Sequence, residues 1–207
     1  NPFDVSYVIV NNSFENLDED GIGLSVWNVE SMNNDTGIRS NETNSYMMEG
    51  SDGHYLFNTW DGPNRGYAIG QDVFLPEGYY TLKCTVAGDA DKTIRMHAGE
   101  AISELTFADG TDEEGNSVAS KTLGQEIMLV FDSKGETINL GLSTTNAWYK
   151  ADNFQLFYMG TAVPTGIDEV TATAPIARSG IYDLSGRRVG KVQKGLYIID
   201  GKKVIVK

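Results

Sequence analysis

Hydrophobic and polar residues alternate most regularly in the segment from residue 79 to residue 86. Tyr80, Leu82, Cys84 and Val86 fall on one side of this segment, and Thr81, Lys83 and Thr85 fall on the other. Because the side chains of a β-strand point alternately to opposite faces, the segment predicts a strand with one buried face. Pro76-Glu77-Gly78 has the composition of a turn, and it separates this strand from another predicted over residues 68–75.

Short segments rich in β-branched and aromatic residues recur along most of the chain. Further strands are predicted over residues 5–10, 93–98, 102–107, 126–131, 136–142 and 153–159. Clusters of Asp, Gly and Asn, such as residues 109–116, separate them. No window of a dozen residues keeps the period of an amphipathic helix. Many short strands joined by glycine-rich turns predict an all-β protein built as an antiparallel β-sandwich.

The charge of the chain changes sign near its C-terminal end. The net charge is −13 over 207 residues, but residues 1–166 hold 8 basic and 25 acidic residues, a net −17, whereas residues 167–207 hold 8 and 4, a net +4. The change coincides with the turn residues Pro164-Thr165-Gly166 and a small-residue stretch at 171–175. We therefore predict a sandwich over residues 1–163, a linker and first part of a tail unit over 164–180, and a small β unit over 181–207.

Composition argues against several classes of function. Net acidity disfavours nucleic acid, because phosphate contacts need clustered Lys and Arg. The longest uninterrupted apolar run, residues 127–131, is far shorter than a membrane-spanning helix, so no membrane span is predicted. The only cysteine, Cys84, lies on the apolar side of its strand and is predicted to be buried. No nucleophile-elbow, zinc-protease, P-loop or dinucleotide motif occurs, which favours a protein that is not an enzyme.

Three segments resemble the galactose-binding-like β-sandwich of carbohydrate-binding modules. They are residues 8–16 (VIVNNSFEN) followed by Trp27, residues 69–82 (IGQDVFLPEGYYTL) and residues 148–158 (WYKADNFQLFY). They are similar to the family's opening "NPSFE … W", its "I-x-Q-x-V-x-L-P-x-G-x-Y-T-L" and its closing "W-x-x-x-D-N/D-F/V-x-L". The resemblance spans about residues 5–160 and implies a jelly-roll-type sandwich in which Trp27 and Trp148 pack structurally. It does not identify a particular sugar.

The same resemblance implies a structural calcium ion between the first strand region and the last strand. The residues at the matching positions are Glu15 and Asp152. Calcium takes six to eight hard oxygen ligands, which two carboxylates and loop carbonyls supply. The other interpretation is that these carboxylates cap turns or accept backbone N–H bonds.

A candidate ligand site lies in residues 54–67, where aromatic and polar residues are mixed. A sugar-binding surface needs an aromatic face for the apolar side of the ring and polar groups for the hydroxyls. The predicted ligand-binding residues are Trp60 as the stacking platform, with Asp61, Asn64 and Arg65 as polar partners and Tyr67 and His54 as further contributors. The other interpretation is that Trp60 packs on the edge of the sandwich. His97 is predicted to be a surface or satisfied strand residue.

Two functions follow from these features. The first is a non-catalytic glycan-binding module, secreted or displayed on the cell surface, whose partner is an oligo- or polysaccharide. The second is a structural or adhesive sandwich that mediates protein–protein or cell-surface interaction without binding sugar. Exposure of Trp60 beside Asn64 and Arg65 would favour the first.

The C-terminal residues resemble the sorting domain of Bacteroidetes surface proteins. Residues 181–189 (IYDLSGRRV), 194–199 (KGLYII) and 201–207 (GKKVIVK) carry the likeness, and the chain is short between Val189 and Gly195. The family is associated with the Por, or type IX, secretion system, so the resemblance implies a secretion-machinery partner and a location outside the outer membrane. The residues themselves predict three short β segments with turns at Ser185-Gly186 and Asp200-Gly201. A basic hairpin that covers an edge of the sandwich is the other interpretation.

Overall fold

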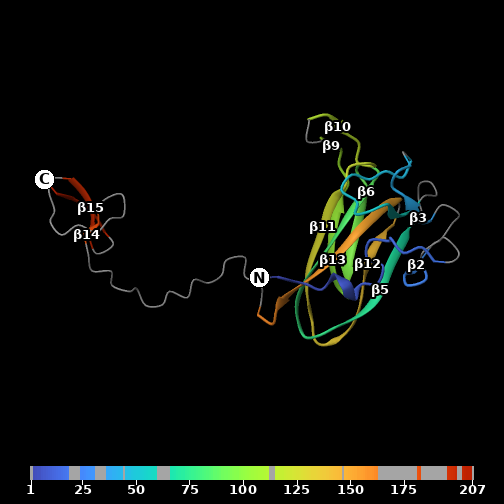
Figure 1. Cartoon of the computed structure of the whole chain (residues 1–207), viewed down its shortest axis with the longest axis horizontal. Coiled ribbons are helices and arrows are strands. Elements are labelled where there is room, and N and C mark those ends of the chain that lie inside the picture. Colours follow the sequence, from blue (N-terminus) through green and yellow to red (C-terminus); the bar gives the residue numbers. More distant parts are fainter. Residues whose placement is uncertain are drawn as a thin grey trace. The chain divides into compact units, whose positions relative to one another are not determined.

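The computed structural model divides the chain into two compact units, Asn1–Pro164 and Thr165–Lys207. The structure describes residues 2–18, 24–30, 36–43, 45–59, 66–111, 115–145, 147–162, 181–182, 195–199 and 202–206. Among these, no helix is long and apolar enough to cross a membrane. Figure 1 shows the β-rich first unit with most of its strands labelled.

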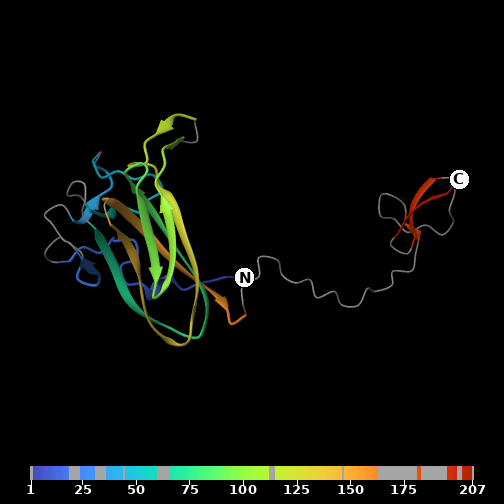
Figure 2. The same ribbon diagram turned by 180° about the vertical axis from the view of Figure 1, so that it is seen from behind.

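Two antiparallel sheets form the first unit, which confirms the predicted β-sandwich. The six-stranded sheet has the order β11-β6-β13-β4-β3, with β1 paired to β13; its strands are β1 (Phe3–Asp4), β3 (Gly37–Ser40), β4 (Tyr55–Asn58), β6 (Gly78–Gly88), β11 (Gln125–Ser133) and β13 (Tyr149–Gly160). The five-stranded sheet has the order β2-β5-β12-β7-β8, with β2 (Asn28–Glu30), β5 (Tyr67–Leu75), β7 (Thr93–Ala98), β8 (Ala101–Thr106) and β12 (Glu136–Thr144). The orange strand β13 lies in front in Figure 1, and the green strands β7 and β8 lie in front in Figure 2.

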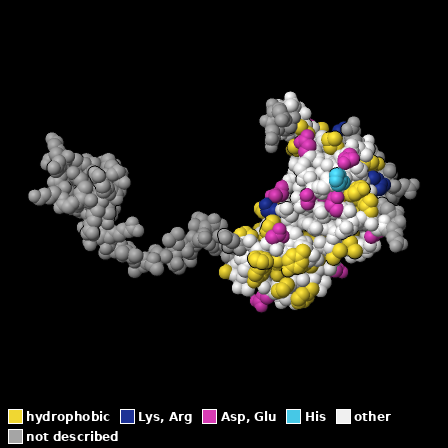
Figure 3. All heavy atoms as spheres, in the orientation of Figure 1, with side chains coloured by type: hydrophobic (Ala, Val, Ile, Leu, Met, Phe, Trp, Pro, Cys, Tyr) yellow, Lys and Arg dark blue, Asp and Glu magenta, His cyan; other side chains and the backbone are white. Residues whose placement is uncertain are grey.

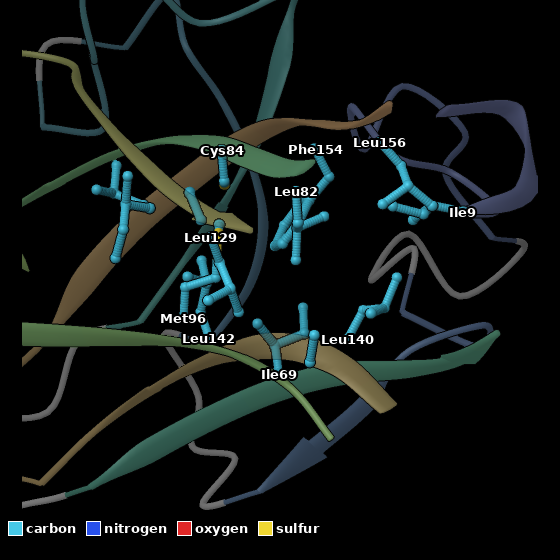
Figure 4. Packing of buried hydrophobic residues seen from close by; sticks show 14 of the residues in the cluster. Ile9, Ile69, Leu82, Cys84, Met96, Leu129, Leu140, Leu142, Phe154 and Leu156 are labelled. Atoms are coloured by element: carbon cyan, nitrogen blue, oxygen red, sulfur yellow. The ribbon is translucent and has the colours of Figure 1, made fainter. Parts of the chain in front are cut away.

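Side chains from the two inner faces form one hydrophobic core. The alternating residues of β6, namely Tyr80, Leu82, Cys84 and Val86, are buried in it as predicted. Figure 4 shows Leu82, Cys84 and Phe154 of the six-stranded sheet facing Ile69, Leu140 and Leu142 of the five-stranded sheet. Trp27 and Trp148 are also buried, which confirms their structural role. The core therefore follows from the period-two pattern of the strands.

Residues 5–10 do not form the predicted strand; they contain the 3₁₀ turn η1 (Ser6–Val8) instead. Oδ1 of Asp4 accepts hydrogen bonds from the backbone N–H of Ser6, at 2.9 Å, and from its hydroxyl, at 2.6 Å. The Ser6 hydroxyl oxygen in turn accepts a bond from the N–H of Leu156. These local bonds compete with a strand ladder, so the β-branched composition alone was misleading here.

The two ends of the sandwich differ in the length of their connections. Short turns at residues 76–77, 99–100 and 134–135 join strands at one end. The connections at 31–36, 59–66, 89–92, 107–124 and 145–148 lie at the opposite end, where β5 meets the end of β12. One of them holds the small ribbon of β9 (Gly110–Thr111) and β10 (Ser117–Val118), seen at the top of Figure 1.

The second unit is a three-stranded antiparallel sheet. It consists of β14 (Ile181–Tyr182), β15 (Gly195–Ile199) and β16 (Lys202–Val206) in the order β14-β15-β16. Ile199 pairs with Lys202, so β15 and β16 form a hairpin around positions 200–201. The predicted turn residues Ser185, Gly186, Asp200 and Gly201 themselves, and the linker over 164–180, lie outside the described residues.

Candidate functional site

The predicted ligand loop connects the two sheets at the end with the long connections. It follows β4 of the six-stranded sheet and leads into β5 of the five-stranded sheet. Trp60, Asp61, Asn64 and Arg65 lie outside the described residues. Tyr67 begins β5, where its backbone pairs with Thr144; its side chain is likewise not described.

Both ends of this loop are held by close backbone contacts. The Thr59 hydroxyl accepts the N–H of Tyr149 at 2.9 Å, and the Thr59 N–H donates to the Tyr149 carbonyl at 3.0 Å. At the other end, a Cβ on Gly66 would lie 2.8 Å from the carbonyl oxygen of Thr144, so the chain passes too close for a side chain. The loop therefore starts and ends at well-fixed positions, as binding loops on a rigid scaffold do.

His54 precedes β4 and therefore lies at the opposite end of this strand from residue 60. Its ring is exposed, and Nδ1 lies 3.2 Å from Oε1 of Glu42. Its backbone N–H donates a hydrogen bond to Glu15.

The carboxylate of Glu15 binds the backbone of the chain just before β4. Oε1 accepts the N–H groups of His54, at 2.9 Å, and Tyr55, at 2.8 Å. The carboxylate lies directly over Gly53: a Cβ there would lie 2.5 Å from Cδ of Glu15, and φ at this residue is +85°. The positive φ favours glycine at position 53, and a side chain there would displace the Glu15 carboxylate.

Asp152 is fully buried on β13 and binds the same loop. Its Oδ2 accepts the N–H of Asp52 and its Oδ1 accepts the N–H of Asn153, both at 2.7 Å. Removal from water raises the pKa of this carboxyl to about 8; the two N–H bonds lower it in part, and the charges of Asp52 and Glu15 raise it further. Asn153 has φ of +54°, and the register of β13 against β6 shifts here.

Glu15 and Asp152, which are 137 positions apart in the sequence, thus both contact residues 52–55. They accept backbone N–H bonds, as the second interpretation of these residues expected. Within the described ranges no group of three or more His, Cys, Asp or Glu side chains is placed to hold a metal ion. The donors present are nevertheless hard oxygens, and Oε2 of Glu15 makes no hydrogen bond to any described residue. This set is chemically compatible with calcium.

A polar row on the outer face of the five-stranded sheet was not predicted from the sequence. Nδ2 of Asn139 donates to Oδ1 of Asp72 at 2.7 Å, and Oδ1 of Asn139 lies 2.8 Å from Nε2 of His97. The three residues come from β12, β5 and β7, so the row crosses the middle of the sheet seen in Figure 2. The expectation that His97 is a satisfied strand residue is confirmed.

Two paired glycines allow these side chains to lie flat on the sheet. Gly70 and Gly141 face each other across β5 and β12. A Cβ on Gly70 would lie 2.7 Å from Oδ1 of Asn139, and one on Gly141 would lie 2.9 Å from Cε1 of His97. The amide and the ring therefore occupy the space that side chains at these positions would fill. The result is a sheet surface with fixed hydrogen-bond donors and acceptors, which suits a ligand rich in hydroxyl groups. The sequence signal was the pair of in-strand glycines, but their register is not readable from the sequence.

Arg95 and Glu104 continue this surface toward the edge of the sheet. They face each other on β7 and β8, and Nη2 of Arg95 lies 2.7 Å from Oε1 of Glu104. Both side chains are about half exposed. Together with Asp72, Asn139 and His97 they form what we call the polar face.

No protein-family model and no curated protein matches the chain. Solved structures resemble the sandwich. The carbohydrate-binding module TmCBM61, solved with β-1,4-galactotriose, is 19% identical, with 73% of this chain and 97% of that chain covered and a TM-score of 0.49. A family 35 carbohydrate-binding module from Clostridium thermocellum is 16% identical, with 63% and 90% covered and a TM-score of 0.39. The K1 cleaved adhesin domain of Lys-gingipain from Porphyromonas gingivalis W83 is 13% identical, with 70% and 94% covered and a TM-score of 0.46. The chain is thus distantly similar in fold to carbohydrate-binding modules and to an adhesin domain.

Proposed function

We propose that the sandwich is a non-catalytic module that binds carbohydrate, using the polar face and the loop of residues 60–65. The observation that supports this best is the row Asp72–Asn139–His97, which holds a carboxylate, an amide and an imidazole at fixed positions on a sheet. The loop leads into β5, the strand that carries Asp72.

The two parts supply complementary chemistry for a sugar. A pyranose ring has hydroxyl groups around its edge and apolar C–H groups on its faces. The polar face offers hydrogen bonds to hydroxyls, and Trp60 is the aromatic group that we assign to stacking, with Asp61, Asn64, Arg65 and Tyr67 as partners. The sequence carries no nucleophile-elbow, zinc-protease, P-loop or dinucleotide motif, so we assign binding rather than hydrolysis.

Glycan-array screening of the wild-type protein, followed by titration of any bound glycan, tests this proposal. We expect Trp60→Ala and Asn139→Ala each to weaken binding by about tenfold or more, since each removes a group that we assign to sugar contact. Val130→Thr is the control, because Val130 is 51% exposed on β11, on the outer face of the other sheet. A folded wild-type protein that binds no glycan would refute the proposal.

We also propose that Glu15 and Asp152 hold a structural calcium ion together with carbonyl oxygens of the loop that both contact. Support comes from the donor chemistry and from the high cost of burying the Asp152 carboxylate without a cation. Calcium would tie the start of the chain to β13 and to the segment before β4. We expect EDTA to lower the melting temperature of the wild type but not of Glu15→Gln. An unchanged melting temperature in the wild type would exclude the site.

For the second unit we propose the role that its sequence resemblance implies, a sorting signal that directs the protein to the cell surface. The three antiparallel strands are consistent with an independently packed signal domain. Export of a reporter fused to residues 165–207, measured in a Bacteroidetes host and in a strain lacking the type IX machinery, tests this. Equal amounts of reporter outside both strains would contradict it.

A further inference from the structure

The outer face of the six-stranded sheet carries a groove of about 490 Å³. Its walls come from β1, β6, β11 and β13 and from Pro2, so it lies on the opposite side of the sandwich from the polar face. In Figure 3, which looks onto this sheet, hydrophobic side chains gather over the lower part of the sandwich. We call this feature the apolar groove.

The lining of the apolar groove is unusual for the solvent side of an antiparallel sheet. Its apolar lining residues are Pro2, Met128, Phe157 and Met159. Met128 is 48% exposed, and Val130, two positions along the same strand, is 51% exposed. Solvent faces of such sheets are normally polar, and a contiguous exposed apolar patch marks a binding surface. Methionine side chains adapt their shape to a partner.

Charged groups at the rim give the groove a net negative charge. The Lys83 ammonium is neutralised by Glu126, whose two oxygens lie 3.0 and 3.1 Å from Nζ. Asp4 makes no ion pair with any described residue, and hydrogen bonds from Ser6 keep the pKa of its carboxyl below the ordinary value. The surrounding unit is itself strongly acidic, with a net −17 over residues 1–166. A partner with basic groups is therefore favoured, and a second copy of this acidic unit is disfavoured.

The strand register sets the length of ligand that the groove accepts. Asp4, Phe157, Thr81 and Val130 form one row across β1, β13, β6 and β11. Neighbouring strands lie about 4.8 Å apart, so this row spans about 14 Å. Met128 lies two residues along β11 from Val130, opposite Lys83, so it is about 16 Å from Asp4, a distance that about five residues of extended peptide bridge. Side chains of an extended peptide face the same way at every second residue.

We propose that the apolar groove binds an extended segment of a basic polypeptide, with one lysine or arginine at Asp4 and large apolar side chains two and four residues away, over Phe157 and Met128. Sugar is a poor match, because the lining offers few groups that could bind hydroxyls. This site is separate from the proposed glycan site, and each can fail without the other.

Isothermal titration with three capped pentapeptides tests the proposal. The first reads lysine, threonine, leucine, threonine, phenylalanine; the second has glutamate in place of lysine; the third has the first peptide's composition with the apolar residues moved to the second and fourth positions. We expect the first to bind about tenfold more tightly than either of the others, because only it presents the charge and both apolar groups on one side. Equal binding of all three, or no binding of the first, would overturn the proposal.

Variants of the protein locate the site. Met128→Thr keeps a residue that favours β-strands and removes the apolar wall, so we expect about fivefold or greater weakening of the first peptide. Asp4→Asn keeps the oxygen that accepts the Ser6 hydrogen bonds but removes the negative charge. We expect it to weaken binding of the first peptide by about two- to fivefold at low salt and to leave binding unchanged at high salt. Phe74→Ser on the other sheet is the control and should bind normally. Unchanged binding by Met128→Thr would place the peptide elsewhere and refute the assignment.

The other possible occupant of the apolar groove is a second copy of the chain, and sedimentation velocity tests for it. A monomeric wild-type protein supports the peptide assignment. If the wild-type protein is a dimer and Met128→Thr is a monomer, self-association covers the groove. This result would overturn the peptide assignment.

Discussion

The buried ammonium of Lys150 gives a direct test of the energetics of the sandwich. Lys150 lies on β13 and is 2% exposed. Its Nζ donates hydrogen bonds to the carbonyl oxygens of Met47, at 2.8 Å, and Lys121, at 2.9 Å, and lies 5.8 Å from the centre of the Trp148 ring. The Met47 carbonyl belongs to the connection of residues 41–54, and the Lys121 carbonyl belongs to the segment of residues 119–124 before β11. The Lys150 side chain therefore joins two loops to the sheet.

Burial lowers the pKa of Lys150 to about 8, with a smaller contribution from the charge of Lys121. The ordinary pKa is 10.5, and each pKa unit corresponds to about 1.4 kcal/mol. The charged form therefore costs the folded protein up to about 3 kcal/mol at neutral pH. Between pH 8 and 10.5 the native state loses this proton while the unfolded state keeps it, so the free energy of unfolding rises with pH in that window.

Urea denaturation between pH 7 and pH 10.5 measures this effect. Lys150→Met has a similar length and cannot titrate, so the free energy of unfolding of the wild type minus that of the variant isolates Lys150. We expect this difference to increase by up to about 3 kcal/mol across the range. Lys134→Met is the control, because Lys134 is an exposed residue whose pKa is raised by Asp132. The free energy of unfolding of the wild type minus that of Lys134→Met should therefore not rise with pH. A difference for Lys150 that is constant or falls with pH would refute the reasoning.

Three further predictions concern stability. Tyr149→Phe should leave the free energy of unfolding unchanged or raise it by about 1 kcal/mol, because the buried Tyr149 hydroxyl has no hydrogen-bond partner among the described residues; urea denaturation measures this. Gly141→Ala should lower the free energy of unfolding by about 2 kcal/mol or more, because the new Cβ would collide with the carbonyl oxygen of Ile69. Ser143→Ala on the same strand should lower it little, and equal urea midpoints for the two variants would contradict the collision. Calcium should raise the melting temperature more at pH 8.5 than at pH 6, since Asp152, with its pKa of about 8, must lose its proton to bind the ion; a rise that shrinks with pH would contradict this.

The strands were predictable because a strand's pattern is local. The alternation from Tyr80 to Val86 reports one buried face wherever the neighbouring strands lie, and the strands at residues 93–98 and 136–142 were found in the same way. Residues 5–10 show the limit of this signal. Their β-branched composition was similar, but hydrogen bonds from Ser6 to Asp4 stabilise a turn instead.

The candidate sites were predictable only where the sequence itself marked them. Glu15 and Asp152 were singled out by a resemblance, and the structure brings them to the same short loop. The loop around Trp60 stood out by its mixture of aromatic and polar residues, and its role remains a prediction. His97 and Asn139 had no local signal, because each is an ordinary polar strand residue until the sheet places it beside a partner.

The sequence by itself thus determined the all-β class, the longer strands between residues 67 and 160 and the change of charge near residue 166, because each depends on residues that are close together in the chain. The short strands β2, β3 and β4 were not predicted. Only the tertiary structure decided which strands are neighbours and in which register. That register brings Asp72 to Asn139, 67 positions apart, and Asp4 to Phe157, 153 positions apart. The polar face and the apolar groove both arise from such pairings. They depend on long-range hydrogen bonding between strands, which no short window of the sequence contains.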